Sequence, residues 1–392
     1  MASLFVTHVL TSVGSFSIPI LLPLIKNDFG LTHTQVGTVT SSYFLGTGLM
    51  SAVAGGTVDF FGFRKMIIFG SLLVGGSLIT AAWMPNFGTM MALLILAGMG
   101  YGVVTPSTNK AVMYWFHERV RATAMGFKQT GINGGGFLAG IIIPPLALAL
   151  SWHSALSVAG LVVMGTSVLT IKVYREGTPS RRYLIAGQWL MQVKEVLRNR
   201  NILLLSAEGF FRVGVQMAFL TYIVLFLQTT LSLRFAFASL LFAIVQASGA
   251  AGRIAWGFVS DRMFGGRRKA VYMLTGLIAM ACFFLLGQLG QSTPFWVALV
   301  TVSCLGFTAV GHQGVGLALL GECAGLELTG TASGIGQSFF FLGVVLISPF
   351  LGFIVDTFET FSHAWSSLAL LSLLCCLILY FVQERPKSSE RR

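Results

Sequence analysis

Three basic residues stand deep inside long apolar runs of this sequence, at Lys128, Arg212 and Arg253. A charge near the centre of a bilayer costs about 2.5–3.5 kcal/mol on insertion scales, so each one needs a compensating interaction. Glu208 precedes Arg212 by four residues, and the two can pair on one helix face. One acid against three cations leaves positive charge without a partner, and such a cavity attracts anions. We therefore predict that the three cations bind an anionic solute, because Arg grips a carboxylate bidentately and Lys supplies a mobile point charge.

Polar residues near these cations complete the predicted site. Amide side chains can donate to and accept from a ligand, and three are assigned to substrate binding: Gln129, Gln216 and Gln337. Three residues are assigned to proton coupling, because a buried acid or an imidazole can take up a proton: Glu208, His8 and His312.

Three alternatives to ligand contact remain open at this stage. Glu208 and Arg212 can form a purely structural pair, and His312 can serve only in packing. Arg253 can extend to the nearer membrane interface or pair with the loop that holds Asp261. These alternatives differ in where each side chain points, which the sequence does not specify.

The composition is that of a polytopic membrane protein. Of the 392 residues, 55% are hydrophobic and 10% are charged, whereas soluble domains carry about 25% charged residues. This surface excludes a soluble enzyme and a nucleic-acid-binding module. The 5 cysteines show no C-x-x-C spacing, so we expect no metal, no disulfide and no other cofactor.

Twelve apolar runs are each long enough to cross a bilayer, and only helices satisfy the backbone there. The fold class is therefore all-α, with twelve transmembrane helices in two six-helix bundles. The runs lie near residues 3–25, 33–57, 66–84, 88–112, 122–148, 153–174, 201–228, 235–259, 270–290, 294–320, 329–354 and 362–382.

The distribution of Lys and Arg predicts the orientation. Of 25 such residues, Lys26 and Arg234 fall in connections on one side, and Lys110 lies in the apolar runs with the three cations above. The other 19 lie on the opposite side, which the positive-inside rule assigns to the cytoplasm together with both termini. We expect a multi-pass inner-membrane protein with an N-terminal bundle at 1–174, a cytoplasmic loop at 175–200 and a C-terminal bundle at 201–392. Part of the loop, 183–198, is either an amphipathic helix or a basic linker.

The two halves repeat one another, which is the mark of a secondary transporter. Gly55-x-x-x-Asp59 is followed by Gly62-x-Arg64-Lys65, and Gly257-x-x-x-Asp261 is followed by Gly265 and a basic cluster. This loop resembles the signature of the major facilitator superfamily, whose two halves rock about a central site. The resemblance implies a cytoplasmic gate formed by loop acids and cations: Asp59, Arg64, Lys65, Asp261, Arg262 and Arg268. The alternative is that these cations only orient the chain.

Glycine is concentrated in the second, fifth, eighth and eleventh spans, where small side chains allow close helix approach. We expect these four spans to form the seam between the halves. The residues concerned are Gly46, Gly48, Gly55, Gly126, Gly131, Gly134, Gly135, Gly136, Gly140, Gly249, Gly252, Gly257, Gly330, Gly334 and Gly343. The alternative is general packing between helices.

The functional hypothesis is a monomeric, proton-coupled symporter that moves a small organic anion across the lipid bilayer by alternating access. The run Lys128-Gln129-Thr130-Gly131 resembles the cyanate, nitrate and organic-anion branch of the superfamily. The alternative is a proton-driven cation or drug exporter. Such exporters usually need a deep acid in the N-terminal half, and Asp28 and Asp59 instead lie at span ends.

Overall fold

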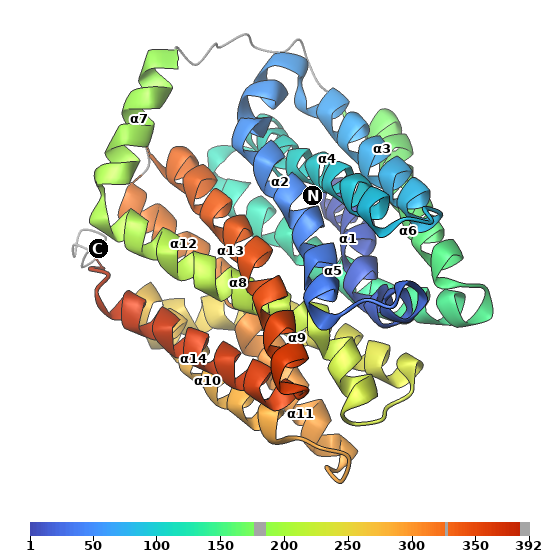
Figure 1. Cartoon of the computed structure of the whole chain (residues 1–392). Coiled ribbons are helices and arrows are strands. Elements are labelled where there is room, and N and C mark those ends of the chain that lie inside the picture. The colour runs from blue at the N-terminus through green and yellow to red at the C-terminus, as the bar shows by residue number, and fades with distance from the viewer. Residues whose placement is uncertain (176–185, 326–327, 385–392) are drawn as a thin grey trace.

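The computed structural model describes residues 1–175, 186–325 and 328–384 and shows a helical protein (Figure 1). The elements are α1 (Ala2–Phe29), α2 (His33–Phe61), α3 (Phe63–Ala82), α4 (Phe87–Trp115), α5 (Glu118–Ala149), α6 (Trp152–Val173), α7 (Ala186–Arg198), α8 (Arg200–Thr229), α9 (Phe235–Phe258), η1 (Val259–Met263), α10 (Arg268–Gln288), α11 (Phe295–Leu305), η2 (Gly306–Val310), α12 (Gln313–Ala324), α13 (Thr329–Phe358) and α14 (Phe361–Tyr380).

The twelve predicted spans are present as twelve long helical segments in the described residues. The eighth continues from α9 into the π-helical turn η1, and the tenth runs through α11, η2 and α12. Eleven of the segments are long and apolar enough to cross a membrane. The remaining one is α2, a helix of 29 residues. The predicted all-α fold class is confirmed.

The helices form two groups that lie side by side in Figure 1, α1–α6 in blue to green and α8–α14 in yellow-green to red. The groups repeat each other's packing: α1 lies against α5 as α8 lies against α13, and α3 lies against α6 as α10 lies against α14. The groups also meet where α1 contacts α8, but the two most extensive contacts between them are α2 with α13 and α5 with α9. These are the second, fifth, eighth and eleventh spans, so the predicted seam is confirmed.

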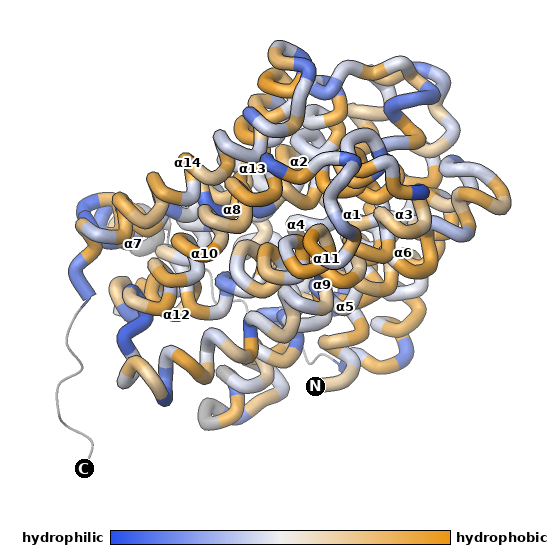
Figure 2. Tube along the Cα trace, turned by 90° about the horizontal axis from the view of Figure 1, so that it is seen from below, coloured by the Kyte–Doolittle hydropathy of each residue, from blue (hydrophilic) through white to orange (hydrophobic). Residues whose placement is uncertain are grey.

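The outer surface of the helices is largely apolar. Hydrophobic colour dominates the helices in Figure 2, and large side chains such as Leu161, Ile254 and Leu370 are more than half exposed. An apolar surface of this extent belongs in lipid and not in water.

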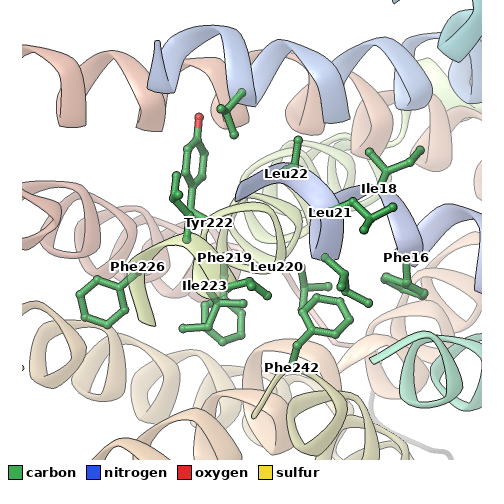
Figure 3. Packing of buried hydrophobic residues seen from close by; sticks show 14 of the residues in the cluster. Phe16, Ile18, Leu21, Leu22, Phe219, Leu220, Tyr222, Ile223, Phe226 and Phe242 are labelled. Carbon is green, nitrogen blue, oxygen red and sulfur yellow. The ribbon is translucent and has the colours of Figure 1, made fainter. Parts of the chain in front are cut away.

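The hydrophobic cores show where the two groups meet. We call the side at which α1 and α8 begin the proximal face, and the side at which they end the distal face. One large core crosses between the groups toward the distal face, where Phe16 and Leu21 of α1 meet Phe219 and Leu220 of α8 (Figure 3). Toward the proximal face there are two separate cores in the described residues, one within 4–174 and one within 196–382. The groups are therefore packed together distally and apart proximally.

The segment between the groups contains a helix, α7, in agreement with the predicted amphipathic helix. Residues 183–185 of that prediction lie outside the described residues. Thr331 Oγ1 of α13 donates to Gln192 Oε1 at 2.9 Å, and Val196 is fully buried in the proximal core of the second group. This contact fixes α7 to the second group.

Six of the glycines assigned to the seam pack within one group, which corrects that part of the expectation. A Cβ on Gly46 would meet Ile95 of α4, one on Gly135 would meet Val9 of α1, and one on Gly343 would meet Phe210 of α8. Four others do face the opposite group: Gly48, Gly136, Gly140 and Gly249. Small residues are needed wherever helices approach closely, so glycine content alone does not locate the moving seam.

Candidate anion site at the seam

Lys128 is a fully buried cation in the middle of the first group. Its ammonium group donates to Thr108 Oγ1 at 3.0 Å and to Asn109 Oδ1, both on α4. Among the described side chains, no carboxylate pairs with it. Two neutral oxygens partly solvate the ammonium but leave its charge uncompensated.

Arg253 approaches the same region from the second group. Nη1 donates across the seam to the Gln129 carbonyl oxygen at 3.0 Å, and Nη2 donates to Gln313 Oε1. Gln313 Nε2 in turn donates to Gln216 Oε1 at 3.1 Å. Arg253 Nε is buried and has no hydrogen-bond partner in the described structure. The guanidinium therefore has a donor available and, among the described residues, no acid beside it.

The two cations lie in one electrostatic neighbourhood. His8 Nε2 lies 3.0 Å from Thr108 Oγ1, the same hydroxyl that Lys128 contacts. His8 is also close enough to interact with the charges of both Lys128 and Arg253. Tyr101 of α4 lies within electrostatic range of Arg253. The structure thus places a Lys inside the first group near His8, and an Arg of the second group at the carbonyl of the next residue, Gln129.

Arg212 lies elsewhere, inside the second group. Its Nε donates to Glu208, and its guanidinium carbon is 4.2 Å from the centre of the Tyr272 ring. A small cavity beside it is lined only by residues of the second group, among them Phe283 and Cys375. The predicted pairing of Glu208 with Arg212 is confirmed, and both side chains are buried.

The alternative for Arg253 that involves the Asp261 loop is wrong. Asp261 Oδ1 instead pairs with Arg268 Nη2 at 2.8 Å. Arg253 faces the seam because α9 packs on α5, and this brings its guanidinium to the Gln129 carbonyl.

The other predicted site residues occupy several positions. Gln216 is buried and belongs to the Arg253 network, whereas Gln129 contributes its backbone oxygen. Gln337 is a partly exposed residue of α13 and joins none of these hydrogen bonds. His312 is buried beside Tyr272, with the rings 5.7 Å apart. In the described structure the Nδ1 atoms of His8 and His312 have no hydrogen-bond partner.

The loop residues assigned to a gate form contacts within their own group. Asp59 Oδ1 is 2.7 Å from Lys110 Nζ, and Arg64 Nη2 donates to the Ile171 carbonyl at 2.8 Å. In the second group Arg268 pairs with Asp261 and also lies 3.4 Å from Glu322. Lys65 is exposed at the start of α3, and Arg262 lies over the Phe258 ring at 5.6 Å.

A polar contact that joins the groups lies at the distal face, and the sequence analysis did not anticipate it. Asp356 at the end of α13 accepts from the backbone N–H groups of His33 and Thr34, each at 2.8 Å. The Thr34 hydroxyl donates to the same carboxylate at 2.7 Å. An acid at the N-terminus of α2 complements the partial positive charge there. We refer to Asp356 with His33 and Thr34 as the distal contact.

Sequence reasoning also missed Tyr101, Asn109 and Lys110. Lys110 stood among the cations of the apolar runs, and its charge alone was a signal that an acid lay nearby. Asn109 and Tyr101 are residue types that a sequence does not single out as part of a site. Only the packing of α4 brings them near the cations.

Comparison with known proteins agrees with this architecture. Residues 4–346 match the Major Facilitator Superfamily, and the chain belongs to that family, as its loop signature predicted. It is therefore a membrane transporter and not an enzyme. It is 27% identical to the hexuronate transporter of Bacillus subtilis, over 92% of this chain and 89% of that one. It is 24% identical to a 4-hydroxybenzoate transporter of Pseudomonas putida, over 73% of this chain and 71% of that one.

Among solved structures, a bacterial homologue of the human lysosomal transporter Spinster, in an inward-facing and occupied conformation, matches with a TM-score of 0.80. The two sequences are 15% identical, and the match covers 97% of this chain and 95% of that one. This likeness concerns the fold.

Proposed function

We propose that this protein transports a small carboxylate across the inner membrane, and that Lys128 and Arg253 hold the carboxylate between the two halves. The observation that carries the proposal is the burial of Lys128 without an acidic partner among the described residues, while an Arg of the opposite half bonds the carbonyl of the next residue, Gln129. An anion bound there compensates both charges at once. Charge-assisted bonds from an Arg and a Lys are the usual means of holding a carboxylate.

The similarity to transporters named for hexuronate and 4-hydroxybenzoate supports the carboxylate class, because both names denote carboxylates. A cation exporter is less well supported. Asp28 accepts from Trp152 Nε1 at 3.0 Å, and Asp59 is paired with Lys110, so neither acid serves a cationic ligand at the seam.

The transport cycle that we propose is alternating access. The groups share a core and the distal contact at one face and have separate cores at the other. A rocking motion therefore separates the groups at the distal face and brings them together at the proximal face. We assign the proximal face to the cytoplasm, because 19 of the 25 Lys and Arg residues belong to the connections and tail that the sequence predicts on that side. The halves 1–174 and 201–392 are the moving units, with 175–200 on the cytoplasmic side.

In this cycle the loop acids and cations stabilise each half near the cytoplasmic face and favour one state. Lys110 is the partner of Asp59 in the present state. Arg212 stabilises the second group through its pair with Glu208 and does not contact the anion. His8 carries the coupled proton, since it lies beside the Thr108 hydroxyl that Lys128 contacts and its Nδ1 has no described partner. The protein works as a monomer, because each chain holds both cations.

The test is uptake of radiolabelled benzoate and galacturonate into proteoliposomes, with and without an imposed pH gradient. Lys128→Met and Arg253→Met are the test variants, and Lys172→Met, an exposed lysine of α6, is the matched control. Hydrogen bonds to charged groups contribute about 1.5–3 kcal/mol, so each test variant is expected to lose about 10- to 150-fold in affinity. The control is expected to match the wild type. Uptake that persists unchanged in both test variants contradicts the proposal.

A further inference from the structure

We propose that α7 lies on the membrane surface and binds the headgroups of anionic phospholipids, so that it holds the proximal end of the second group at the lipid. This inference goes beyond the proposed function, because it does not depend on the transported solute. The proximal face is the side that we assign to the cytoplasm, where the bilayer leaflet carries anionic lipids.

Two connections hold α7 at the level of the membrane surface. The helix ends at Arg198 and the membrane-spanning helix α8 begins at Arg200, so a single residue separates them. Thr331 Oγ1, in the first turn of the spanning helix α13, donates to Gln192 Oε1 of α7 at 2.9 Å. Figure 1 shows α7 beside the starts of α8 and α13, running across the direction of α8. A helix held in this way lies in the plane of the interface.

The second group covers one edge of α7 and leaves the other edge open. Val196 marks the covered edge, because its side chain is fully buried in the proximal core of that group. At about 3.6 residues per turn, the side chains from the covered edge to the open edge follow the order Val196, Val193, Leu197, Lys194 and Arg198. Val193 is partly buried, Leu197 is 46% exposed, and the two cations are exposed. The apolar face of α7 is therefore wider than the surface that the protein covers.

The open edge carries positive charge beside the uncovered apolar residues. Among the described residues, no carboxylate pairs with Lys194, Arg198 or Arg200. Glu195, the one acid in the sequence of α7, lies on the far side of Arg198 from Leu197. Lys and Arg side chains can rest their stems on apolar surface while their charged groups reach toward a headgroup.

This arrangement fits a lipid surface. An apolar strip with basic residues along one edge, on a helix that lies in the interface plane, places its aliphatic side chains at the acyl boundary and its cations at the phosphates. A soluble phosphate would satisfy the cations but leave Val193 and Leu197 in water. The partner is therefore the headgroup of a lipid that is part of the bilayer.

The experiment is native mass spectrometry of the purified full-length protein, titrated with phosphatidylglycerol in detergent, which gives the dissociation constant of the first lipid bound. Each Lys or Arg near an anionic surface strengthens binding by a factor of about 5, so Lys194→Gln/Arg198→Gln is expected to weaken binding by about 30-fold. Lys172→Gln/Arg175→Gln is the matched control, because it removes the same charge from exposed side chains of the first group. The control is expected to bind phosphatidylglycerol as the wild type does.

A third variant tests the apolar strip. Leu197→Gln is expected to weaken phosphatidylglycerol binding by about 5-fold, because α7 then buries less apolar surface in the lipid. The side chain is exposed to solvent in part and is not in the proximal core, so the change does not disturb the packing of Val196.

Each outcome decides for or against the lipid contact. If Lys194→Gln/Arg198→Gln binds as the wild type, or if the control weakens binding equally, α7 is not the lipid site. If Leu197→Gln binds as the wild type and the soluble headgroup glycerophosphoglycerol displaces the lipid, α7 binds a free phosphate and the membrane contact is refuted. Lys128→Met is expected to leave lipid binding unchanged, so a failure of the proposed function is distinguishable from a failure of this inference.

Discussion

Removing Lys128 and removing Arg212 are expected to change protein stability in opposite directions. A Lys at the centre of an apolar helix is disfavoured by about 2.5–3.5 kcal/mol, and the one buried bond, from Lys128 to Thr108, offsets about 1.5 kcal/mol of this. The bond to Asn109 is partly exposed and largely replaces a bond to water. Lys128→Met is therefore expected to raise the free energy of unfolding by about 1–2 kcal/mol. Thr108 keeps other partners, and Asn109 is partly exposed, so the removal of the ammonium costs these two residues little.

Arg212→Met has the opposite effect because it leaves Glu208 buried without its partner. Removing one member of a buried ion pair costs about 3–5 kcal/mol. The double variant Glu208→Leu/Arg212→Met is expected to recover most of this loss, since no charge is then left alone. The comparison distinguishes a cation that binds a ligand from a cation that stabilises the fold.

The assay is unfolding by SDS titration in mixed micelles, followed by tryptophan fluorescence, with the ligand absent. Lys172→Met is the control, because its side chain is exposed. If Lys128→Met lowers the free energy of unfolding by more than about 1 kcal/mol, the reasoning is refuted, because Lys128 then stabilises the fold and needs no anion. A loss below about 1 kcal/mol in Arg212→Met would refute the structural role of the Glu208 pair.

Three further predictions concern the seam and the loops. Asp356→Asn removes the charge at the N-terminus of α2 and is expected to raise the equilibrium constant for opening of the distal contact by about 5- to 30-fold. The measurement is the rate at which a membrane-impermeant maleimide labels Thr40→Cys, which is expected to increase. Gly140→Ala places a Cβ 2.8 Å from Ala243 and is expected to slow uptake, whereas Gly126→Ala, with nothing within 4 Å, leaves uptake unchanged. Asp59→Asn is expected to change the free energy of unfolding by less than about 1 kcal/mol, since its pair with Lys110 is partly exposed, and to alter the uptake rate without altering benzoate affinity.

Much of the fold follows from the sequence because lipid leaves few options. A long apolar run can satisfy its backbone only as a helix, so the run near 201–228 predicts α8 (Arg200–Thr229) to within a few residues. Local spacing was equally informative for Glu208 and Arg212, which pair one helical turn apart.

The site itself depends on contacts that sequence spacing does not encode. Arg253 reaches Gln129, a residue 124 positions away, only because α9 packs on α5. Asp356 reaches His33 over 323 positions. Arg212 stands deep in an apolar run, as Arg253 does, but the position of a residue along a helix does not say which face its side chain occupies. Arg212 faces its own bundle and Arg253 faces the seam, so a prediction from depth alone assigned them similar roles.

The central claim is that the unpaired cations of the seam recognise a carboxylate, and charge discrimination tests it most directly. Titration calorimetry with benzoate and its neutral amide, benzamide, compares two ligands of nearly the same shape. The wild type is expected to bind benzoate at least about 10-fold more tightly than benzamide, and the Lys128→Met/Arg253→Met variant is expected to lose that preference. A wild type that binds benzamide as well as benzoate, or a variant that keeps the full preference for benzoate, would contradict the account.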